Sequence, residues 1–300
     1  MKYLNYEYVN NHLYNTDGKE VSAEECFNGI PQLRIGSKQT FKGRVTRYMS
    51  SYFPNYNNNL VANDEIVFQY ASGLNKYKGK KILIVGGGPT TNQCQWQNLD
   101  FDYVWSCNHF YQHPILKKIG TDLAFIGQEV DLRDGEFLSH CINNNTHVVF
   151  EPSGRITVTG GGLNINKIVD IPDSQHMCCF TRYYGWIGAN WRQMILALFL
   201  GVKEIYFVGM DGYSFKTNPK NIQHSFEPGK EPKGGPMKPG AEEAVKQHLI
   251  IFWNYVLNRL KPETKFYNLG EFSEDNMTAE ISKKHFPLSD EIKKTIGVEC

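Results

Sequence analysis

The stretch that decides the fold runs from Lys80 to Thr91 and reads KKILIVGGGPTT. Its first half contains a short, continuous apolar run, Ile82 to Val85, which is rich in β-branched residues and bounded by lysines and glycines. A run of this length and composition predicts a strand buried on both faces, as in a parallel sheet, rather than a helix. Because the strand leads directly into three glycines, we expect a tight turn at its carboxyl end.

Further strand candidates follow, and most of the gaps between them are long enough for a helix. They are residues 103–107, 123–126, 147–150, 203–211 and 265–269. One helix is predicted over 191–200, with Asn190 as its N-cap and Gly201 just past its end, and an amphipathic helix is predicted over 241–260. This alternation predicts the α/β class, as a Rossmann-like open, mostly parallel sheet flanked by helices.

The predicted domain organisation has two parts. Residues 80–300 form a Rossmann-like catalytic domain, in which residues 214–240 are a long loop rich in Pro, Gly and Lys. Loops of this length inside a compact domain commonly act as lids, so we expect a lid loop here. Residues 1–79 are rich in Tyr and Asn and are predicted to be an irregular N-terminal extension with a few strands or short helices. Their basic residues between 34 and 47 are interpreted as a solvated face.

Composition excludes several classes of function. The chain has 300 residues, with 32 Lys and Arg against 31 Asp and Glu, so it lacks the cationic excess of a nucleic-acid-binding surface. No run approaches the ~20 apolar residues of a transmembrane segment, and the N-terminus shows no hydrophobic signal segment. Seven cysteines without a CxxC pair and nine histidines without zinc-ligand spacing predict reduced thiols and no metal site. We expect a cytoplasmic protein; peripheral attachment to the inner membrane face and homo-oligomerisation stay open.

The glycine turn is the first candidate binding site. Three consecutive glycines let the backbone approach a ligand closely, and a helix starting after them would offer free N–H groups to a phosphate. The pattern is not a complete dinucleotide fingerprint, since Thr91 stands at the third glycine position, and it is not a Walker loop. We predict a nucleotide-phosphate turn, the alternative being a tight turn that only ends a strand. The residues assigned to it are Gly86, Gly87, Gly88, Pro89 and Thr90.

Five further polar side chains are candidates for the site. Asn108 follows the second strand, and both Asp211 and Tyr213 end a later one, so we expect all three at the carboxyl edge of the sheet, where ligands bind. Asn190 begins the helix before that later strand and is also assigned to ligand binding. His224 stands in the long loop, where an imidazole can act as a general base near neutral pH. Taken alone, the position of Asn108 favours a structural turn residue, and Asp211 is equally interpretable as a structural turn cap.

In their order and spacing, these segments resemble the bacterial sialyltransferases that decorate lipooligosaccharide, and the related nonulosonate transferases. The family's Gly-Asn-Gly-Pro-Ser after its first strand corresponds to GGGPT at 86–90. Its Asp-Phe-Asp-Val-Phe-Arg-Cys-Asn-Gln-Phe-Tyr corresponds to DFDYVWSCNHFY at 100–111, and its Lys-Glu-Ile-Tyr-Leu-Ser-Gly-Ile-Asp-Phe-Tyr to KEIYFVGMDGY at 203–213. Its closing strand resembles FYNL at 266–269, and the resemblance covers about residues 80–275.

The resemblance implies a fold, a reaction and roles for single residues. The reaction is an inverting, metal-independent transfer of an acid sugar from a CMP-linked donor to a glycan hydroxyl, without a cofactor. The glycine turn then binds the nucleotide phosphate, and Asn108 contacts the donor nucleotide. Tyr213 stabilises the departing phosphate, and His224 deprotonates the acceptor hydroxyl.

Two more positions match the family only when the alignment is shifted. Gln128 falls near a donor-binding Asn of the family, and Arg182 matches an Arg that precedes the later block. The chain departs from the pattern at Gly87, where the family has Asn, at Thr90, where it has Ser, and at 188–190, where it has Thr-Ser-Gly. These departures leave the donor sugar and its nucleotide open.

Three other functions stay open from the sequence. A related branch of the family resembles a pterin diphosphokinase, which transfers pyrophosphate from ATP and needs Mg²⁺, for which Asp211 is one candidate ligand without a clear second. A non-catalytic nucleotide-binding module would bind the ligand without turnover. A dehydrogenase is disfavoured because the dinucleotide fingerprint is broken.

Overall fold

The computed structural model describes most of the predicted α/β unit and three short strands near the N-terminus. The described residues are 6–9, 12–15, 20–21, 75–127, 130, 134–150, 176–178, 188–212, 224–228, 241–260, 262–274 and 276–298. The predicted solvated face at 34–47 and most of the predicted lid lie outside these residues.

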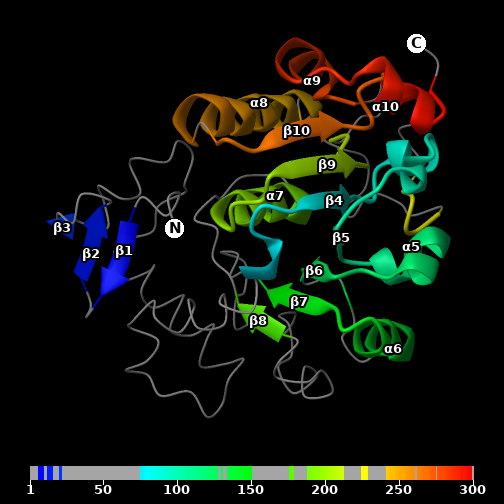
Figure 1. Ribbon diagram of the computed structural model, residues 1–300, viewed down its shortest axis with the longest axis horizontal. Coiled ribbons are helices and arrows are strands. Elements are labelled where there is room, and N and C mark those ends of the chain that lie inside the picture. Colours follow the sequence, from blue (N-terminus) through cyan, green and yellow to red (C-terminus); the bar gives the residue numbers. More distant parts are fainter. Residues whose placement is uncertain are drawn as a thin grey trace.

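Within the described residues, seven strands form one sheet in which every pairing is parallel (Figure 1). In spatial order they are β10 (Lys265–Asn268), β9 (Glu204–Val208), β4 (Lys81–Val85), β5 (Tyr103–Cys107), β6 (Leu123–Ile126), β7 (His147–Phe150) and β8 (His176–Cys178). All but β8 correspond to strands predicted from the sequence. The α/β class with an open parallel sheet is therefore confirmed.

Helices connect the strands and follow the last one. They are α5 (Pro114–Ile119), α6 (Gly135–Asn143), α7 (Ala189–Phe199), α8 (Ala241–Asn254), α9 (Ala279–His285) and α10 (Asp290–Thr295). The predicted helix over 241–260 is present, but its last part, Tyr255–Leu260, is wound as a π-helix. Among the described residues, no helix combines the length and the apolar character that crossing a bilayer requires.

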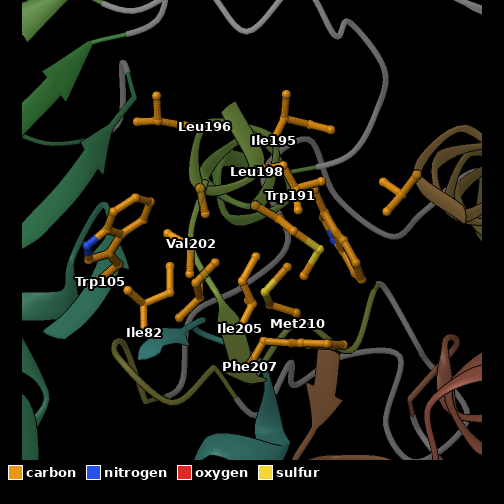
Figure 2. Close-up of a cluster of buried hydrophobic side chains, with 14 of the residues drawn as sticks. Ile82, Trp105, Trp191, Ile195, Leu196, Leu198, Val202, Ile205, Phe207 and Met210 are labelled. Atoms are coloured by element: carbon orange, nitrogen blue, oxygen red, sulfur yellow. The ribbon is translucent and has the colours of Figure 1, made fainter. Parts of the chain in front are cut away.

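Two hydrophobic cores cover the two faces of the sheet. Successive side chains of a strand point to opposite faces, so Ile82 and Ile84 of β4 enter one core and Leu83 and Val85 enter the other. The first core is filled by α7 and α8, where Trp191 is 4% exposed, and the second by α5, α6 and the C-terminal segment. Figure 2 shows the first core, whose labelled members include Trp105, Ile195, Leu198, Val202, Ile205, Phe207 and Met210. Burial on both faces explains why the strands are continuous apolar runs.

Helix α7 begins earlier than the sequence predicts. Gly188 is its N-cap, without a capping side-chain hydrogen bond, and Asn190 lies in its first turn. The prediction of Asn190 as the N-cap is therefore wrong. At the other end, Gly201 follows the helix as predicted and has φ +72°, a left-handed conformation that costs glycine no Cβ contact.

Strand β9 is shorter than predicted, ending at Val208 rather than at Asp211. The cause is Gly209, whose φ of +66° turns the chain out of the sheet. A Cβ on Gly209 would overlap the carbonyl group of Gly86 at the end of β4. The chain after β9 therefore crosses the carboxyl end of the sheet instead of extending it.

The N-terminal region contains three short strands of an antiparallel sheet, in keeping with the few strands expected there. They are β1 (Tyr6–Val9), β2 (His12–Asn15) and β3 (Glu20–Val21). Close to the predicted boundary, Tyr77 is fully buried with its ring 4.9 Å from that of Trp105, and Gly79 N donates to Gly201 O at 2.8 Å. Residues 75–79 thus pack with the sheet, and the division of the chain at residue 79 stays a prediction.

Candidate active site

The glycine turn lies where the order of the strands reverses. β4 pairs with β5, which follows it in the chain, and on its other side with β9, which comes much later. In open parallel sheets, ligands bind at such a reversal, outside the carboxyl ends of the strands. Segments 86–91, 107–109 and 209–212 come together there, and they contain most of the described residues that the sequence nominates.

Two of the three glycines are required because the ends of β4 and β9 approach closely. Gly86 N donates to Val208 O at 2.8 Å, and Gly88 N donates to Gly209 O at 2.9 Å. A Cβ on Gly86 would overlap the Gly209 carbonyl, and a Cβ on Gly88 would overlap that carbonyl and the Asp211 carboxylate. Close packing of backbone therefore explains Gly86 and Gly88 without a ligand.

Asp211 fixes the second half of the turn. Its Oδ2 accepts a hydrogen bond from Thr90 N at 3.0 Å, and its Oδ1 accepts one from Thr90 Oγ1 at 2.5 Å. Thr90 Oγ1 in turn accepts from Gly209 N at 2.9 Å. Because Asp211 is only 2% exposed, these donors stabilise a carboxylate that burial alone would disfavour. Asp211 and Thr90 thus tie the turn to the chain after β9.

The hydrogen bonds of the turn leave few groups for a phosphate. Four of its backbone amides donate within the protein, namely those of Gly86, Gly88, Thr90 and Thr91. Within the described residues, the amide of Gly87 has no acceptor. The helix that follows the glycines is a 3₁₀-helix of only four residues, Pro89–Asn92. A phosphate at this turn would therefore meet the Gly87 amide, not a row of helix-terminal N–H groups.

One short segment of the predicted lid, residues 224–228, is bound to the turn. Ser225 N donates to Gly87 O at 2.8 Å, and Ser225 Oγ donates to Gly88 O at 2.7 Å. The neighbouring Phe226 is 2% exposed, and its ring centroid lies 5.9 Å from that of His113. We call residues 224–228 the anchored segment, because backbone bonds and an apolar side chain both hold it in place.

The anchored segment places the imidazole of His224 over Gly87. A Cβ on Gly87 would lie 2.5 Å from both Nε2 and Cε1 of His224, so a larger residue at this position would displace the ring. The ring therefore explains why position 87, the middle one of the three, is a glycine. It also explains the absence here of the Asn found in the family pattern, because the ring fills the space that its side chain would need. The structure therefore brings together His224 and the glycine turn, which lie far apart in the sequence.

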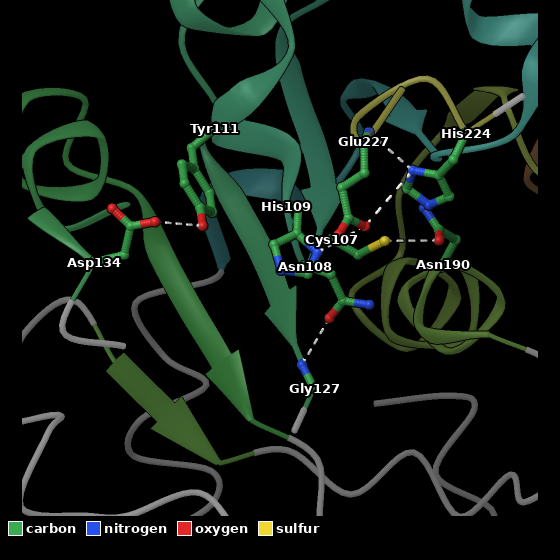
Figure 3. A network of polar contacts seen from close by, with 9 residues as sticks. All are labelled: Cys107, Asn108, His109, Tyr111, Gly127, Asp134, Asn190, His224 and Glu227. Atoms are coloured by element: carbon green, nitrogen blue, oxygen red, sulfur yellow. Dashed lines mark hydrogen bonds and ion pairs between the residues drawn. The ribbon is translucent and has the colours of Figure 1, made fainter. Parts of the chain in front are cut away.

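Glu227 lies between two histidines (Figure 3). Its Oε2 is 3.0 Å from Nδ1 of His109 and 3.8 Å from Nδ1 of His224, and its backbone N donates to the same Nδ1 of His224 at 3.2 Å. Within the described residues, Nδ1 of His109 has no hydrogen-bond partner, so its approach to Oε2 is a close contact outside hydrogen-bond geometry. The side chains of His109, Glu227 and His224 are 12%, 22% and 25% exposed, which places this cluster at the boundary with solvent.

Glu227 and His109 also belong to the site, although neither was predicted from the sequence. The spacing of Glu227 three residues after His224 was one available signal, and the place of His109 next to Asn108 was another. Neither signal identifies the contact between them, because it joins segments more than a hundred residues apart.

Asn108 and Asn190 lie beside the histidine cluster and are partly used by the fold (Figure 3). Asn108 has φ +49°, and its Oδ1 accepts from Gly127 N at 2.8 Å, which links the ends of β5 and β6. Asn190 Oδ1 accepts from Cys107 Sγ at 2.8 Å, and its Nδ2 donates to Val85 O at 3.3 Å. Asn190 therefore joins α7 to β4 and β5, which is why its side chain does not cap the helix. Nδ2 of Asn108 has no acceptor within the described residues.

Three nominated residues lie outside the described residues, namely Gln128, Arg182 and Tyr213. The same holds for residues 214–223 and 229–240 of the predicted lid. The roles assigned to them stay predictions.

Two other reactive side chains near the site are kept neutral at neutral pH by burial. Burial raises the pKa of the Cys94 thiol to about 12 and lowers the pKa of His113, whose Nε2 lies 3.0 Å from Asn92 Oδ1. Neither group is suited to act as a nucleophile or as a charged acid. Among the described residues, no three His, Cys, Asp or Glu side chains are placed to hold a metal ion.

Comparison with known proteins identifies similar solved structures. No family model matches the chain, and no curated protein sequence matches it. The monofunctional α-2,3-sialyltransferase Cst-I from Campylobacter jejuni is 18% identical, with 71% of this chain and 81% of that chain covered and a TM-score of 0.46. The sialyltransferase CstII from Campylobacter jejuni, in complex with cytidine-5'-monophosphate, is 20% identical, with 64% and 80% covered and a TM-score of 0.43.

A further structure of CST-II, in complex with a trisaccharide acceptor and CMP, is 19% identical, with 65% of this chain and 83% of that chain covered and a TM-score of 0.42. All three are sialyltransferases, the family whose motifs the sequence resembles. At identities this low, the chemistry of the site rests on the chain's own residues.

Proposed function

We propose that this protein is a sialyltransferase-like glycosyltransferase. In the proposed reaction, an acid sugar passes from a CMP-linked donor to a glycan hydroxyl, with inversion at the anomeric carbon and without a metal or cofactor. The observation that carries the proposal is the position of His224, which the anchored segment holds against Gly87 at the point where the strand order reverses. An imidazole at this point adjoins both the predicted nucleotide turn and solvent, from which an acceptor can enter.

The proposed chemistry requires a base for the acceptor and donors for the departing phosphate. His224 is suited to the first task because an imidazole exchanges a proton near neutral pH. The Gly87 amide and Nδ2 of Asn108 are donors at the edge of the site, and preorganised donors of this kind stabilise a developing phosphate charge. Tyr213, assigned by the resemblance, would add a hydroxyl donor from the chain that follows Asp211.

The partners follow from the reaction. The proposed substrates are a nucleotide-sugar donor and a glycan acceptor, and nucleic acid is not among the partners. We propose a cytoplasmic enzyme, since its donor is a nucleotide sugar and its cysteines are predicted to be reduced thiols.

The diphosphokinase alternative has Asp211 as its magnesium candidate, and the structure gives this residue a structural use. Both carboxylate oxygens of Asp211 accept hydrogen bonds from Thr90, and the side chain is buried. These bonds account for Asp211 without a metal ion. The non-catalytic nucleotide-binding module differs from the proposed enzyme only in turnover, so activity must separate the two.

A thermal-shift screen tests the nucleotide. CMP, CDP, UDP, GDP, ATP and NAD are added singly, each with and without Mg²⁺. We expect stabilisation by CMP without metal, because a ligand that binds only the native state at 100 times its Kd adds about 2.7 kcal/mol to the free energy of unfolding. A response limited to ATP with Mg²⁺ would overturn the proposal in favour of diphosphate transfer.

A transfer assay tests the chemistry. The chain is incubated with a CMP-linked sialic acid and a set of glycan acceptors, with a chelator present, and the product linkage is determined by NMR. The proposal predicts a product with inverted anomeric configuration and free CMP in equal amount. Binding of CMP without a product from any acceptor would support the non-catalytic module instead.

A further inference from the structure

We propose that Glu227 is a positioning residue for His224, and that His109 competes with His224 for its carboxylate. This inference rests on the proposed function, in which His224 removes the acceptor proton. The observation behind it is that one oxygen, Oε2 of Glu227, lies between two imidazole nitrogens, 3.0 Å from Nδ1 of His109 and 3.8 Å from Nδ1 of His224. The carboxylate is therefore within reach of both imidazoles and lies nearer to that of His109.

The structure specifies which nitrogen of His224 carries the proton. The backbone N–H of Glu227 donates to Nδ1 at 3.2 Å, so Nδ1 presents its lone pair in this arrangement. In the neutral ring the proton is then on Nε2, the nitrogen beside Gly87. Nδ1 faces Glu227, and Nε2 is the nitrogen that we propose meets the substrate. An Nε2 that already carries a proton cannot accept one from an acceptor hydroxyl.

The carboxylate of Glu227 favours the opposite tautomer. At 3.8 Å from Nδ1 it makes no hydrogen bond, but a movement of about 1 Å brings it within hydrogen-bonding distance. In that tautomer Nδ1 carries the proton and its N–H donates a hydrogen bond to Oε2, while Nε2 presents a lone pair. In the reaction, the acceptor O–H proton passes to Nε2, the acceptor oxygen bonds to the anomeric carbon, and CMP leaves with the electrons of the broken bond. Glu227 would stabilise the imidazolium that results.

In this proposal, His109 determines how often the Glu227 carboxylate can approach Nδ1 of His224. Its Nδ1 is the nearer of the two nitrogens to Oε2, and its side chain is the most buried of the three. Because Oε2 lies between the two nitrogens, a movement of the carboxylate toward His224 takes it away from His109. The structure therefore shows the carboxylate nearer to His109, and in this proposal the base-competent state brings it to His224.

Nitrogen NMR on the full chain tests this without any substrate. The chain is labelled with ¹⁵N-histidine and studied at alkaline pH, where the imidazoles are neutral, and His224 is assigned from the spectrum of H224Q. Long-range proton–nitrogen correlations distinguish a protonated nitrogen from one with a lone pair. In the unmodified chain we expect the lone pair of His224 on Nδ1.

Two variants decide the outcome. His109→Phe keeps a ring but removes the competing nitrogen, and we expect the Nδ1–H form of His224 to rise by about tenfold, as for one hydrogen bond to a charged group. Adding Glu227→Gln to that variant should cancel the rise. A tautomer that does not respond to His109→Phe, or a response that persists without the carboxylate, would overturn the proposal. If His109→Phe does not fold, His109→Gln is used with the same expectation.

Kinetics then separate positioning from packing. Glu227→Gln should lower kcat by about 10²-fold with little change in the KM for the donor, because His224 loses the carboxylate that favours its base form while the binding site is kept. Glu280→Gln, the same change at an exposed position of α9, is the matched control and should leave both constants unchanged. Unaltered kcat in Glu227→Gln overturns the positioning role. If the unmodified chain transfers no sugar at all, the proposed function fails, while the NMR result still decides the tautomer proposal.

Discussion

On its β9 side, the glycine turn is held by buried hydrogen bonds, whereas on its other side it meets three partly exposed ionisable side chains. On the first side, Asp211 is 2% exposed, and both of its oxygens accept bonds from Thr90. On the second side, Glu227 is 22% exposed and lies between two histidines, close to only one of them. The difference indicates that the first side fixes the geometry and the second carries groups able to change protonation or partner.

The three adjacent glycines of the turn are required for different reasons on its two sides. Gly86 and Gly88 are glycines because backbone and the Asp211 carboxylate occupy the space of a side chain. Gly87 is a glycine because the His224 ring occupies that space. A single run of three glycines thus serves the scaffold at two positions and the candidate base at one. A substitution in this run should therefore damage either stability or activity according to its position.

The largest expected effect is on the reactive side. His224→Ala should lower sugar transfer by about 10²- to 10⁴-fold, the usual contribution of a positioned general base. The free energy of unfolding should change by less than about 1 kcal/mol, because the His224 side chain is 25% exposed. Transfer rates and urea denaturation measure the two quantities on the same preparation. If the variant still transferred sugar at the normal rate, His224 would not be the base, and the partly exposed side of the glycine turn would have no demonstrated role in catalysis.

The next effect is on the scaffold side. Gly209→Ala should destabilise the fold by about 3 kcal/mol or more, since it combines a left-handed φ of +66° with overlap of the Gly86 carbonyl. Gly79→Ala is the matched control, because Gly79 has φ +73° but no atom within 4 Å of its Cβ. The control should cost only about 1 kcal/mol, the conformational part alone. Equal losses in the two variants would show that close packing of the strand ends is not what requires Gly209.

A smaller effect on the same side comes from the carboxylate. Asp211→Asn replaces one acceptor oxygen by an NH₂ group that faces donors of Thr90, and should cost about 1–3 kcal/mol. Asp102→Asn makes the same change at a side chain that is 40% exposed and accepts from Lys81 N at 2.8 Å, and should cost about 0.5 kcal/mol. Urea denaturation of the pair gives the difference. If Asp102→Asn were the more destabilising variant, the buried carboxylate would not be the support of the turn.

Most of the sheet follows from local sequence, and the exceptions have physical causes. Each predicted strand is an apolar run long enough to show burial on both faces, whereas β8 has only three residues, His-Met-Cys, and no such run. Asn190 is a favourable N-cap residue, yet its side chain is taken by Cys107 and Val85. A tertiary contact has overridden a local preference there, and no pattern within α7 reports it.

The candidate site is predictable only in part, for a related reason. His224 and Asn108 are visible in the sequence because the family resemblance marks their positions, and the glycine turn is visible from its composition. The contact of Glu227 with His109 joins the anchored segment to the chain after β5, so it depends on the fold and not on spacing. The sequence also does not show that the amides of Gly86, Gly88 and Thr90 are used within the protein, because their acceptors are on β9 and the chain that follows it.

The smallest predicted effect concerns His113, which packs under the anchored segment against Phe226. Burial lowers the pKa of His113, so on acidification the unfolded chain takes up a proton on this residue before the folded chain does. Between the two pKa values the unfolded state holds more protons, and the free energy of unfolding therefore falls as the pH drops below about 6.5. His140 behaves in the same way, so His113 accounts for only part of this slope.

His113→Gln isolates that part, because a glutamine amide can still donate to Asn92 Oδ1 but does not titrate. Urea denaturation at a series of pH values from about 7 to 5 should show a shallower loss of stability than in the unmodified chain. His285→Gln, at an exposed position of α9, should leave the slope unchanged. A slope that His113→Gln does not alter would mean that the ring beneath the anchored segment is protonated equally in both states.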